Sequence, residues 1–121
     1  MSTRCRIAIE NEDHSVDSIY CHFDGYIIGV GKYLYENYKT DESVKKLISM
    51  GDRSSIDKDD SVYEDTKGQP MHFQDVKDLV SYFKTSDQEY LYLYGCGCWL
   101  VATPWDFTDQ GLEFDLLEDV L

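Results

Sequence analysis

The feature that most constrains the fold is an alternation of apolar and polar side chains near the start of the chain. Segments 3–10 and 18–23 each carry an apolar residue at every second position. These positions are Cys5, Ile7 and Ile9 in the first segment and Ile19, Cys21 and Phe23 in the second. A period of two is typical of a β-strand with one covered face. Because a polar turn at 11–14 separates the two segments, they predict an antiparallel hairpin.

Helical periodicity takes over in the middle of the chain. Apolar residues spaced four apart predict a first helix across 30–38. Thr40 or Asp41 can cap a second helix, which Gly51 should end. The most regular stripe lies within 73–84, where apolar positions form one face and polar residues occupy the other. Three helices are therefore expected between the first hairpin and the last third of the chain.

Strand patterns return after the third helix and decide the fold class. Segments 89–94 and 98–103 are rich in aromatic and β-branched residues and flank a Gly-Cys-Gly turn, which predicts a second hairpin. Segment 112–116 alternates again, whereas 52–70 is polar and predicts an exposed loop. We therefore expect one domain, residues 1–121, of the α+β class. It should contain an antiparallel sheet of four or five strands with two or three helices packed on one face.

The distribution of charge indicates the kind of partner. The net charge is -13, and no Lys or Arg follows Lys84, although eight Asp and Glu residues do. A field of this sign repels nucleic acid and anionic membranes and steers the protein towards basic protein surfaces. Neither a signal peptide nor a run of ~20 apolar residues is visible. We expect a cytoplasmic protein with a basic protein partner, and no direct contact with nucleic acid or membrane.

Four cysteines raise the question of a metal or redox site. Cys5 and Cys21 share the inward faces of the first predicted hairpin, while Cys96 and Cys98 lie at the tip of the second. Zinc ligands usually come as C-x₂-C pairs on tight turns, and the C-x-C spacing here has no second pair beside it. We expect reduced thiols and no cofactor. Metal ligation by the four cysteines, and redox use of the C-x-C pair, remain alternatives.

The strand and loop around residues 20–31 hold the other chemically suggestive side chains. His22 and Asp24 share a polar face, which indicates a structural hydrogen-bond pair or, with Ser18 or Tyr20, a catalytic set. No nucleophile elbow or phosphate-loop motif accompanies them, so we expect no enzyme. Loop packing explains the nearby glycines, and a site for an anionic ligand is the alternative. That site would comprise Arg4, Arg6, Tyr20, His22, Asp24, Gly25, Gly29 and Gly31.

Several stretches of the first half of the chain also match a known pattern. Segment 18–26 reads Ser-Ile-Tyr-Cys-His-Phe-Asp-Gly-Tyr, followed by Gly-Val-Gly at 29–31 and Gly-Asp-Arg-Ser-Ser-Ile at 51–56. With the alternating segment 3–10, they resemble a family of small proteins encoded by bacteriophages and related mobile elements. The chain departs from that pattern at Phe23, where Trp is usual. The resemblance implies a viral or mobile-element origin and carries over no catalytic residue.

Charge, size and resemblance together give the leading functional hypothesis. We expect a phage-encoded accessory protein that binds and inhibits a host protein, such as a nucleic-acid-binding component of antiviral defence. An acidic, Tyr-rich surface would occupy a Lys/Arg cleft, in one version by mimicking nucleic acid. The predicted contact residues are Tyr90, Tyr92, Tyr94, Asp106, Asp109, Glu113, Asp115, Glu118 and Asp119. The alternative is a protein that sequesters an anionic nucleotide signal at the ligand site named above.

Overall fold

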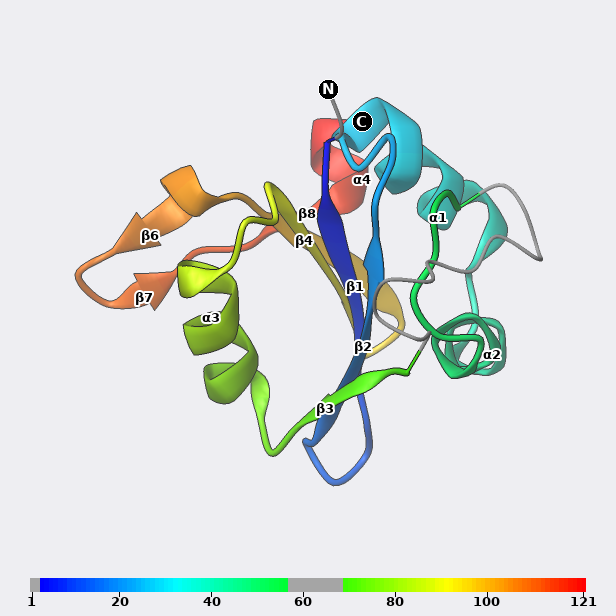
Figure 1. The fold of residues 1–121 in the computed structure, drawn as a ribbon, viewed down its shortest axis with the longest axis horizontal. Coiled ribbons are helices and arrows are strands. Elements are labelled where there is room, and N and C mark those ends of the chain that lie inside the picture. Colours follow the sequence, from blue (N-terminus) through cyan, green and yellow to red (C-terminus); the bar gives the residue numbers. More distant parts are fainter. Residues whose placement is uncertain (1–2, 57–68) are drawn as a thin grey trace.

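A six-stranded sheet runs through the middle of the protein (Figure 1). The computed structural model describes residues 3–56 and 69–121, and within these ranges the strand order is β3-β2-β1-β4-β5-β8. The strands are β1 (Cys5–Glu10), β2 (Val16–Cys21), β3 (Met71–Phe73), β4 (Tyr90–Gly95), β5 (Cys98–Ala102) and β8 (Asp115–Leu116). The predicted α+β class is confirmed, and both predicted hairpins, β1–β2 and β4–β5, are present.

The centre of the sheet differs from the predicted antiparallel arrangement. Strands β1 and β4 run parallel, with Ile7 opposite Tyr92, while every other described pair in this sheet is antiparallel. The short strands β3 and β8 extend the two edges, so six strands form where the sequence predicts four or five. A parallel pair requires a crossover connection, and here helices supply it between β2 and β4. Local periodicity does not encode which hairpins become neighbours.

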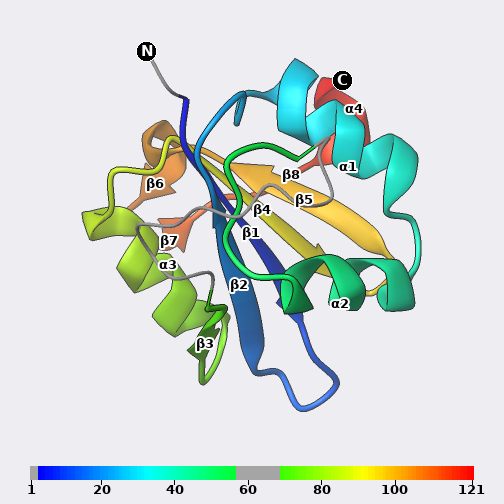
Figure 2. The ribbon, with the colours of Figure 1, turned by 45° about the vertical axis from the view of Figure 1, so that its right-hand side comes forward.

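Helices cover both faces of the sheet (Figures 1 and 2). One face carries η1 (Ile27–Gly31, a π-helical turn), α1 (Lys32–Asn37), α2 (Asp41–Ser49) and α4 (Leu117–Val120). The other face carries α3 (Val76–Thr85) and a small hairpin of β6 (Phe107–Thr108) and β7 (Gly111–Leu112), which follows η3 (Pro104–Asp106). The sequence predicts helices on one face only. Two-sided packing arises because β4 is apolar at consecutive positions, so both of its faces need cover.

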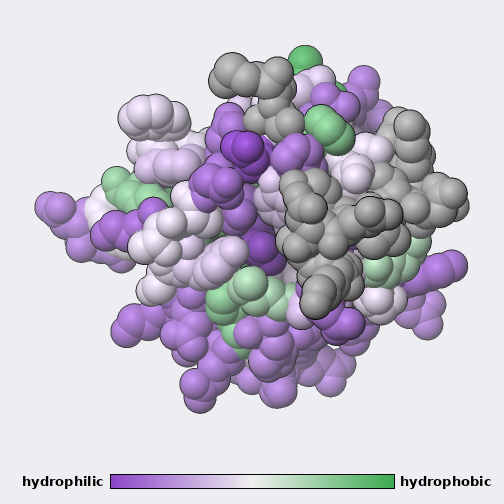
Figure 3. All heavy atoms as spheres, in the orientation of Figure 1, coloured by the Kyte–Doolittle hydropathy of each residue, from purple (hydrophilic) through white to green (hydrophobic). Residues whose placement is uncertain are grey.

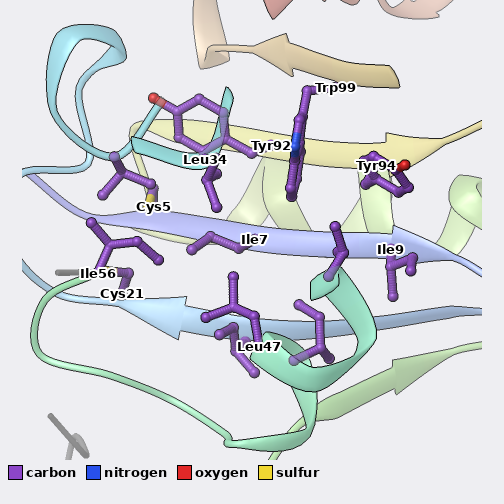
Figure 4. Close-up of a cluster of buried hydrophobic side chains, with 14 of the residues drawn as sticks. Cys5, Ile7, Ile9, Cys21, Leu34, Leu47, Ile56, Tyr92, Tyr94 and Trp99 are labelled. Atoms are coloured by element: carbon purple, nitrogen blue, oxygen red, sulfur yellow. The ribbon is translucent and has the colours of Figure 1, made fainter. Parts of the chain in front are cut away.

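The larger core lies between the sheet and the first group of helices. Figure 4 shows Tyr92, Trp99 and Tyr94 in a row beside Ile7 and Ile9. Helices α1 and α2 close this layer with buried leucine, valine and isoleucine side chains. A smaller cluster on the opposite face packs α3 and the β6–β7 hairpin against the alternate residues of β1 and β4. The pleat of each central strand therefore contributes to two separate cores.

The predicted second helix has its expected ends. Thr40 is the N-cap of α2, and its Oγ1 accepts a hydrogen bond from the Ser43 amide at 3.2 Å. Gly51 follows the helix with a φ of 84°, a left-handed conformation that glycine adopts without steric cost. The predicted exposed loop differs, because Asp52 and Arg53 are 5% and 2% exposed beside the end of β2. Most of that loop, residues 57–68, lies outside the described residues.

The remaining described elements are shorter than the sequence predicts. The helical stripe begins at α3 with Asp75 as its N-cap, and Phe73 joins the edge strand β3 instead. The alternating segment 112–116 divides between β7 and β8. Hydrophilic residues cover most of the face seen in Figure 3, with small apolar areas between them. Among the described residues, no helix has the length and apolar character needed to cross a membrane.

Candidate partner-binding surface

The predicted tyrosine anchors of β4 are not surface residues. Tyr92 and Tyr94 are 0% and 3% exposed, and Tyr90 is half-buried with its ring stacked on Tyr92 at 6.2 Å between centroids. The Tyr92 hydroxyl donates to the Gly25 carbonyl at 2.7 Å, and burial strongly raises the pKa of this phenol. Because β4 lies at the centre of a sheet covered on both faces, its tyrosines belong to the core. An exposed Tyr90–Tyr92–Tyr94 surface is therefore a mistaken expectation.

A groove nevertheless brings aromatic side chains and one predicted acid together at the β5–β8 edge of the sheet. Its volume is about 270 Å³, and it lies on the face covered by α1 and α4. The lining residues are Tyr35, Tyr38, Lys39, Tyr94, Gly97, Cys98, Trp99, Leu116 and Glu118. We call this the aromatic groove. Of the nine predicted contact residues, Tyr94 and Glu118 meet here.

Backbone hydrogen bonds hold the walls of the aromatic groove in place. The Trp99 indole donates to the Tyr38 carbonyl at 2.8 Å, and the Tyr94 hydroxyl donates to the Lys39 carbonyl at 3.4 Å. The Tyr94 and Trp99 rings meet edge to face at 5.1 Å. Loss of water contact, with a further contribution from nearby Asp41, raises the pKa of Tyr94. These two walls are therefore preorganised, with the polar tips of Trp99 and Tyr94 already bonded.

The rim of the aromatic groove is acidic and partly apolar. Tyr35 is 38% exposed, and its hydroxyl donates to Glu118 Oε2 at 3.4 Å. Leu116 is similarly exposed, and Lys39 is the one cation among the described lining residues. Asp115 and Asp119 are exposed on the same β8–α4 segment. An exposed aromatic ring beside exposed carboxylates can receive a cationic side chain.

The other predicted acids lie elsewhere. Asp106 is half-buried at the third position of η3 and completes the capping box with the N-cap Thr103, accepting from the Thr103 amide at 2.8 Å and from its hydroxyl at 3.0 Å. Its role is structural. Asp109 and Glu113 are exposed in and just after the β6–β7 hairpin. They are close in sequence to α4, but the hairpin packs on the opposite face of the sheet (Figures 1 and 2). The six predicted acids therefore divide into two groups instead of one face.

Three aromatic residues that matter to the surface or to the groove wall were not predicted from the sequence. Tyr35 lies off the apolar stripe of the first predicted helix, which was a signal that its side chain faces solvent. Trp99 alternates with Leu100 in β5, so its side of the strand could not be chosen from the sequence. Trp105 is 91% exposed on η3, the highest exposure among the large apolar side chains described. Its neighbour Pro104 indicates a turn but gives no measure of exposure.

The predicted anionic-ligand residues separate into two groups. Arg4, Arg6, Tyr20 and His22 line one cleft of about 560 Å³ between the β1–β2 hairpin and α3. The other described residues of its lining are Asp52, Gln69, Pro70, Met71, Tyr82, Asp87 and Gln88. We call this the Arg6 cleft. Asp24 instead lines a separate hollow of about 130 Å³.

The three predicted glycines do not form a phosphate loop. The Gly25 amide donates to the Thr3 carbonyl, and the Gly29 and Gly31 amides both donate to the Tyr26 carbonyl. A Cβ at Gly25 would lie 2.7 Å from that Thr3 oxygen, so glycine here permits close packing. Because these amides are already bonded, they are not available to a ligand. The expectation that Gly25, Gly29 and Gly31 contribute to an anion site is therefore corrected.

The four cysteines do not converge. Cys5 and Cys21 are paired across β1 and β2 in the core, whereas Cys96 and Cys98 lie at the opposite end of β4, in and after the β4–β5 turn. Burial raises the pKa of Cys5, which favours its thiol form. Among the described residues, no group of three or more His, Cys, Asp or Glu side chains is placed to hold a metal ion.

Comparison with protein-family models, with curated proteins and with solved structures finds no match to this chain. The aromatic groove and the Arg6 cleft are the two regions of the described structure with candidate binding chemistry.

Proposed function

We propose that this protein binds a basic surface of a host protein through the aromatic groove and inhibits it by occupying that surface. The observation that carries the proposal is the combination of exposed Tyr35, buried Trp99 and acidic Glu118 in one preformed groove. A Lys or Arg side chain fits such a site chemically. Its aliphatic stem packs on the rings, and its charged end meets the carboxylate.

The charge of the whole chain supports the same type of partner. A net charge of -13 accelerates encounter with a basic surface and disfavours acidic competitors. Asp115 and Asp119 extend the negative rim beside Glu118 along β8 and α4. The partner we propose is a nucleic-acid-binding effector of antiviral defence in the cytoplasm of an infected bacterium, consistent with the resemblance to phage proteins. Such effectors present Lys- and Arg-lined clefts.

A charge-reversal pair tests the groove. Tagged protein and its Glu118→Lys variant are used to capture partners from infected bacterial cells, followed by mass spectrometry and titration of the captured protein. Asp78→Lys is the matched control, because Asp78 is exposed on α3 at the opposite face and the net charge changes equally. We expect Glu118→Lys alone to lose the partner. Equal loss in both variants would show a general charge effect and contradict the groove proposal.

Competition by nucleic acid tests the mimicry version. If the protein occupies the nucleic-acid cleft of its partner, a DNA or RNA oligonucleotide should displace it from the captured complex in proportion to oligonucleotide affinity. Binding that survives saturating oligonucleotide would place the contact outside that cleft and exclude mimicry. The salt dependence of complex formation is measured in parallel, because an acidic–basic interface weakens as ionic strength rises.

A further inference from the structure

The described lining of the Arg6 cleft includes a buried cation, Arg6, although the chain as a whole is strongly acidic. Arg6 lies in β1 between Cys5 and Ile7, so the pleat turns its side chain away from the larger core and towards α3. The residue is 4% exposed. Figures 1 and 2 show α3 standing over this face of β1 and β2. A guanidinium is therefore held almost out of water, in a hollow large enough for a small molecule.

The contacts of Arg6 are all to neutral groups. Its Nε donates to Gln88 Oε1 at 3.4 Å, its Nη1 donates to Ser18 Oγ at 2.9 Å, and the guanidinium lies 4.9 Å from the centre of the Tyr82 ring. Within residues 3–56 and 69–121, no carboxylate forms an ion pair with it. Buried charges are normally paired, because an uncompensated one is costly. Among the described residues Arg6 therefore has no counter-charge, and a bound anion would supply one.

One nitrogen of Arg6 is free to make that contact. Neither hydrogen bond of the side chain uses Nη2, and no side-chain nitrogen or oxygen among the described residues is both fully buried and unpartnered. Nη2 therefore retains some solvent-accessible surface, and Arg6 lines the cleft. Ser18 and Gln88, 0% and 5% exposed, fix the orientation of the guanidinium through these two hydrogen bonds. The donor is thus aimed by a network that is itself buried.

A second cation stands at the mouth of the Arg6 cleft. Arg4 Nε lies 3.7 Å from Asp87 Oδ2, and the two side chains are 37% and 69% exposed. Exposed pairs of this kind contribute little, so an entering anion can take Asp87's place. The other acid of the cleft, Asp52, is 5% exposed and accepts from the Tyr20 amide at 2.7 Å. Its remaining acceptor capacity suits hydroxyl or amino donors of a ligand.

We propose that the Arg6 cleft binds the phosphate group of a small phosphate ester of the nucleotide class. Guanidinium groups match phosphate oxygens in geometry and charge, and two of them converge here. The volume of about 560 Å³ exceeds what a bare phosphate requires, so the ligand has an organic body. Tyr82 and Met71 offer ring and thioether surface to that body, while Asp52 and Gln88 offer acceptors. This site is independent of the aromatic groove.

Calorimetric titration with three probes tests the proposal. AMP should bind, whereas adenosine, which lacks the charge, and inorganic phosphate, which lacks the body, should each bind at least about tenfold more weakly. Arg6→Gln should weaken AMP binding by about 10- to 100-fold, the loss expected for hydrogen bonds from a charged donor. Lys77→Gln is the control, because it removes an exposed cation from α3 outside the cleft; its AMP affinity should be unchanged.

Chemical-shift mapping on the unaltered protein keeps the test decisive if Arg6→Gln does not fold. AMP should shift the backbone amides of Ser18, Tyr20 and Gln88 and leave those of the aromatic groove in place. The proposal is overturned if AMP produces neither heat nor shifts, if it shifts another region, or if folded Arg6→Gln binds AMP as well as the parent. Equal affinity for AMP and inorganic phosphate would overturn the nucleotide class.

Discussion

The aromatic groove and the Arg6 cleft lie on opposite faces of one sheet and have opposite electrostatic character. The groove is built from rings whose polar tips bond to backbone carbonyls, and its rim is acidic. The cleft is built from polar side chains that bond to one another around a buried cation. The acidic rim of the groove agrees with the net charge of the chain, whereas the buried cation of the cleft could not be expected from it. Local chemistry follows from which side chains are buried together, and a total of -13 does not report it.

Substitutions in the two regions should also differ in their effect on the stability of the fold. Trp99 and Tyr94 belong to the large core, so a change in the groove wall is also a change in the core. Arg6 is buried without a carboxylate partner among the described residues, so its removal takes away a desolvated charge and not an ion pair. We therefore expect the groove wall to be sensitive to substitution and the cleft floor to tolerate it.

The largest expected effect is at the groove wall. Trp99→Ala removes a 5% exposed indole, its edge-to-face contact with Tyr94 and its bond to Tyr38, and should lower the free energy of unfolding by about 3–5 kcal/mol. Trp105→Ala is the matched control, because that indole is 91% exposed and should change stability by about 0.5 kcal/mol or less. Urea denaturation measures both. Similar losses for the two variants would show that Trp99 is not a core residue.

A crossed pair of substitutions separates the two regions. Glu118→Lys should abolish capture of the protein partner and leave AMP binding unchanged, whereas Arg6→Gln should weaken AMP binding by about 10- to 100-fold and leave capture unchanged. Melting temperatures of both variants should stay near that of the parent, since Glu118 is exposed and Arg6 lacks an acidic partner among the described residues. If either variant impaired both functions, the two regions would form one site.

The free energy of unfolding should fall at alkaline pH because of Tyr92. The pKa of Tyr92 is raised in the folded protein, so its contribution is complete below about pH 10, the unfolded value, and is lost as pH rises further. The slope for one such group is about 1.4 kcal/mol per pH unit. Tyr92→Phe removes the bond to Gly25, costing about 1 kcal/mol near neutral pH. Its unfolding free energy should fall less steeply above pH 10; parallel profiles would contradict the assignment.

The smallest expected effect lies at the mouth of the Arg6 cleft. Asp87→Asn releases Arg4 from an exposed pair and should raise AMP affinity by up to about fivefold, with no measurable change in stability. Asp78→Asn, on the exposed side of α3, is the control for the change in net charge. An equal gain in both variants would attribute the effect to the overall field. Weaker binding in Asp87→Asn would show that Asp87 contacts the ligand.

The parts of the fold that follow from local signals were predictable. The β1–β2 hairpin, the cap at Thr40 and the stop at Gly51 each depend on residues near one another in the sequence. The candidate sites were only partly predictable. Arg4, Arg6, Tyr20 and His22 meet as expected, because they share one face of a predicted hairpin. The other contacts of Arg6 come from Tyr82 in α3 and from Gln88 in the segment after it. No local sequence pattern indicates that these residues pack against β1.

The sequence by itself determined the two hairpins, the main helices, the acidic character of the last third and the α+β class. Each depends on composition or on a period of two or 3.6 residues, and both are local properties. Only the tertiary structure decided which faces are covered. Alternation shows that a strand has two sides, but the parallel docking of β4 against β1 and the position of α3 determine what lies over each. That docking buries Tyr92 on one side and isolates the charge of Arg6 on the other.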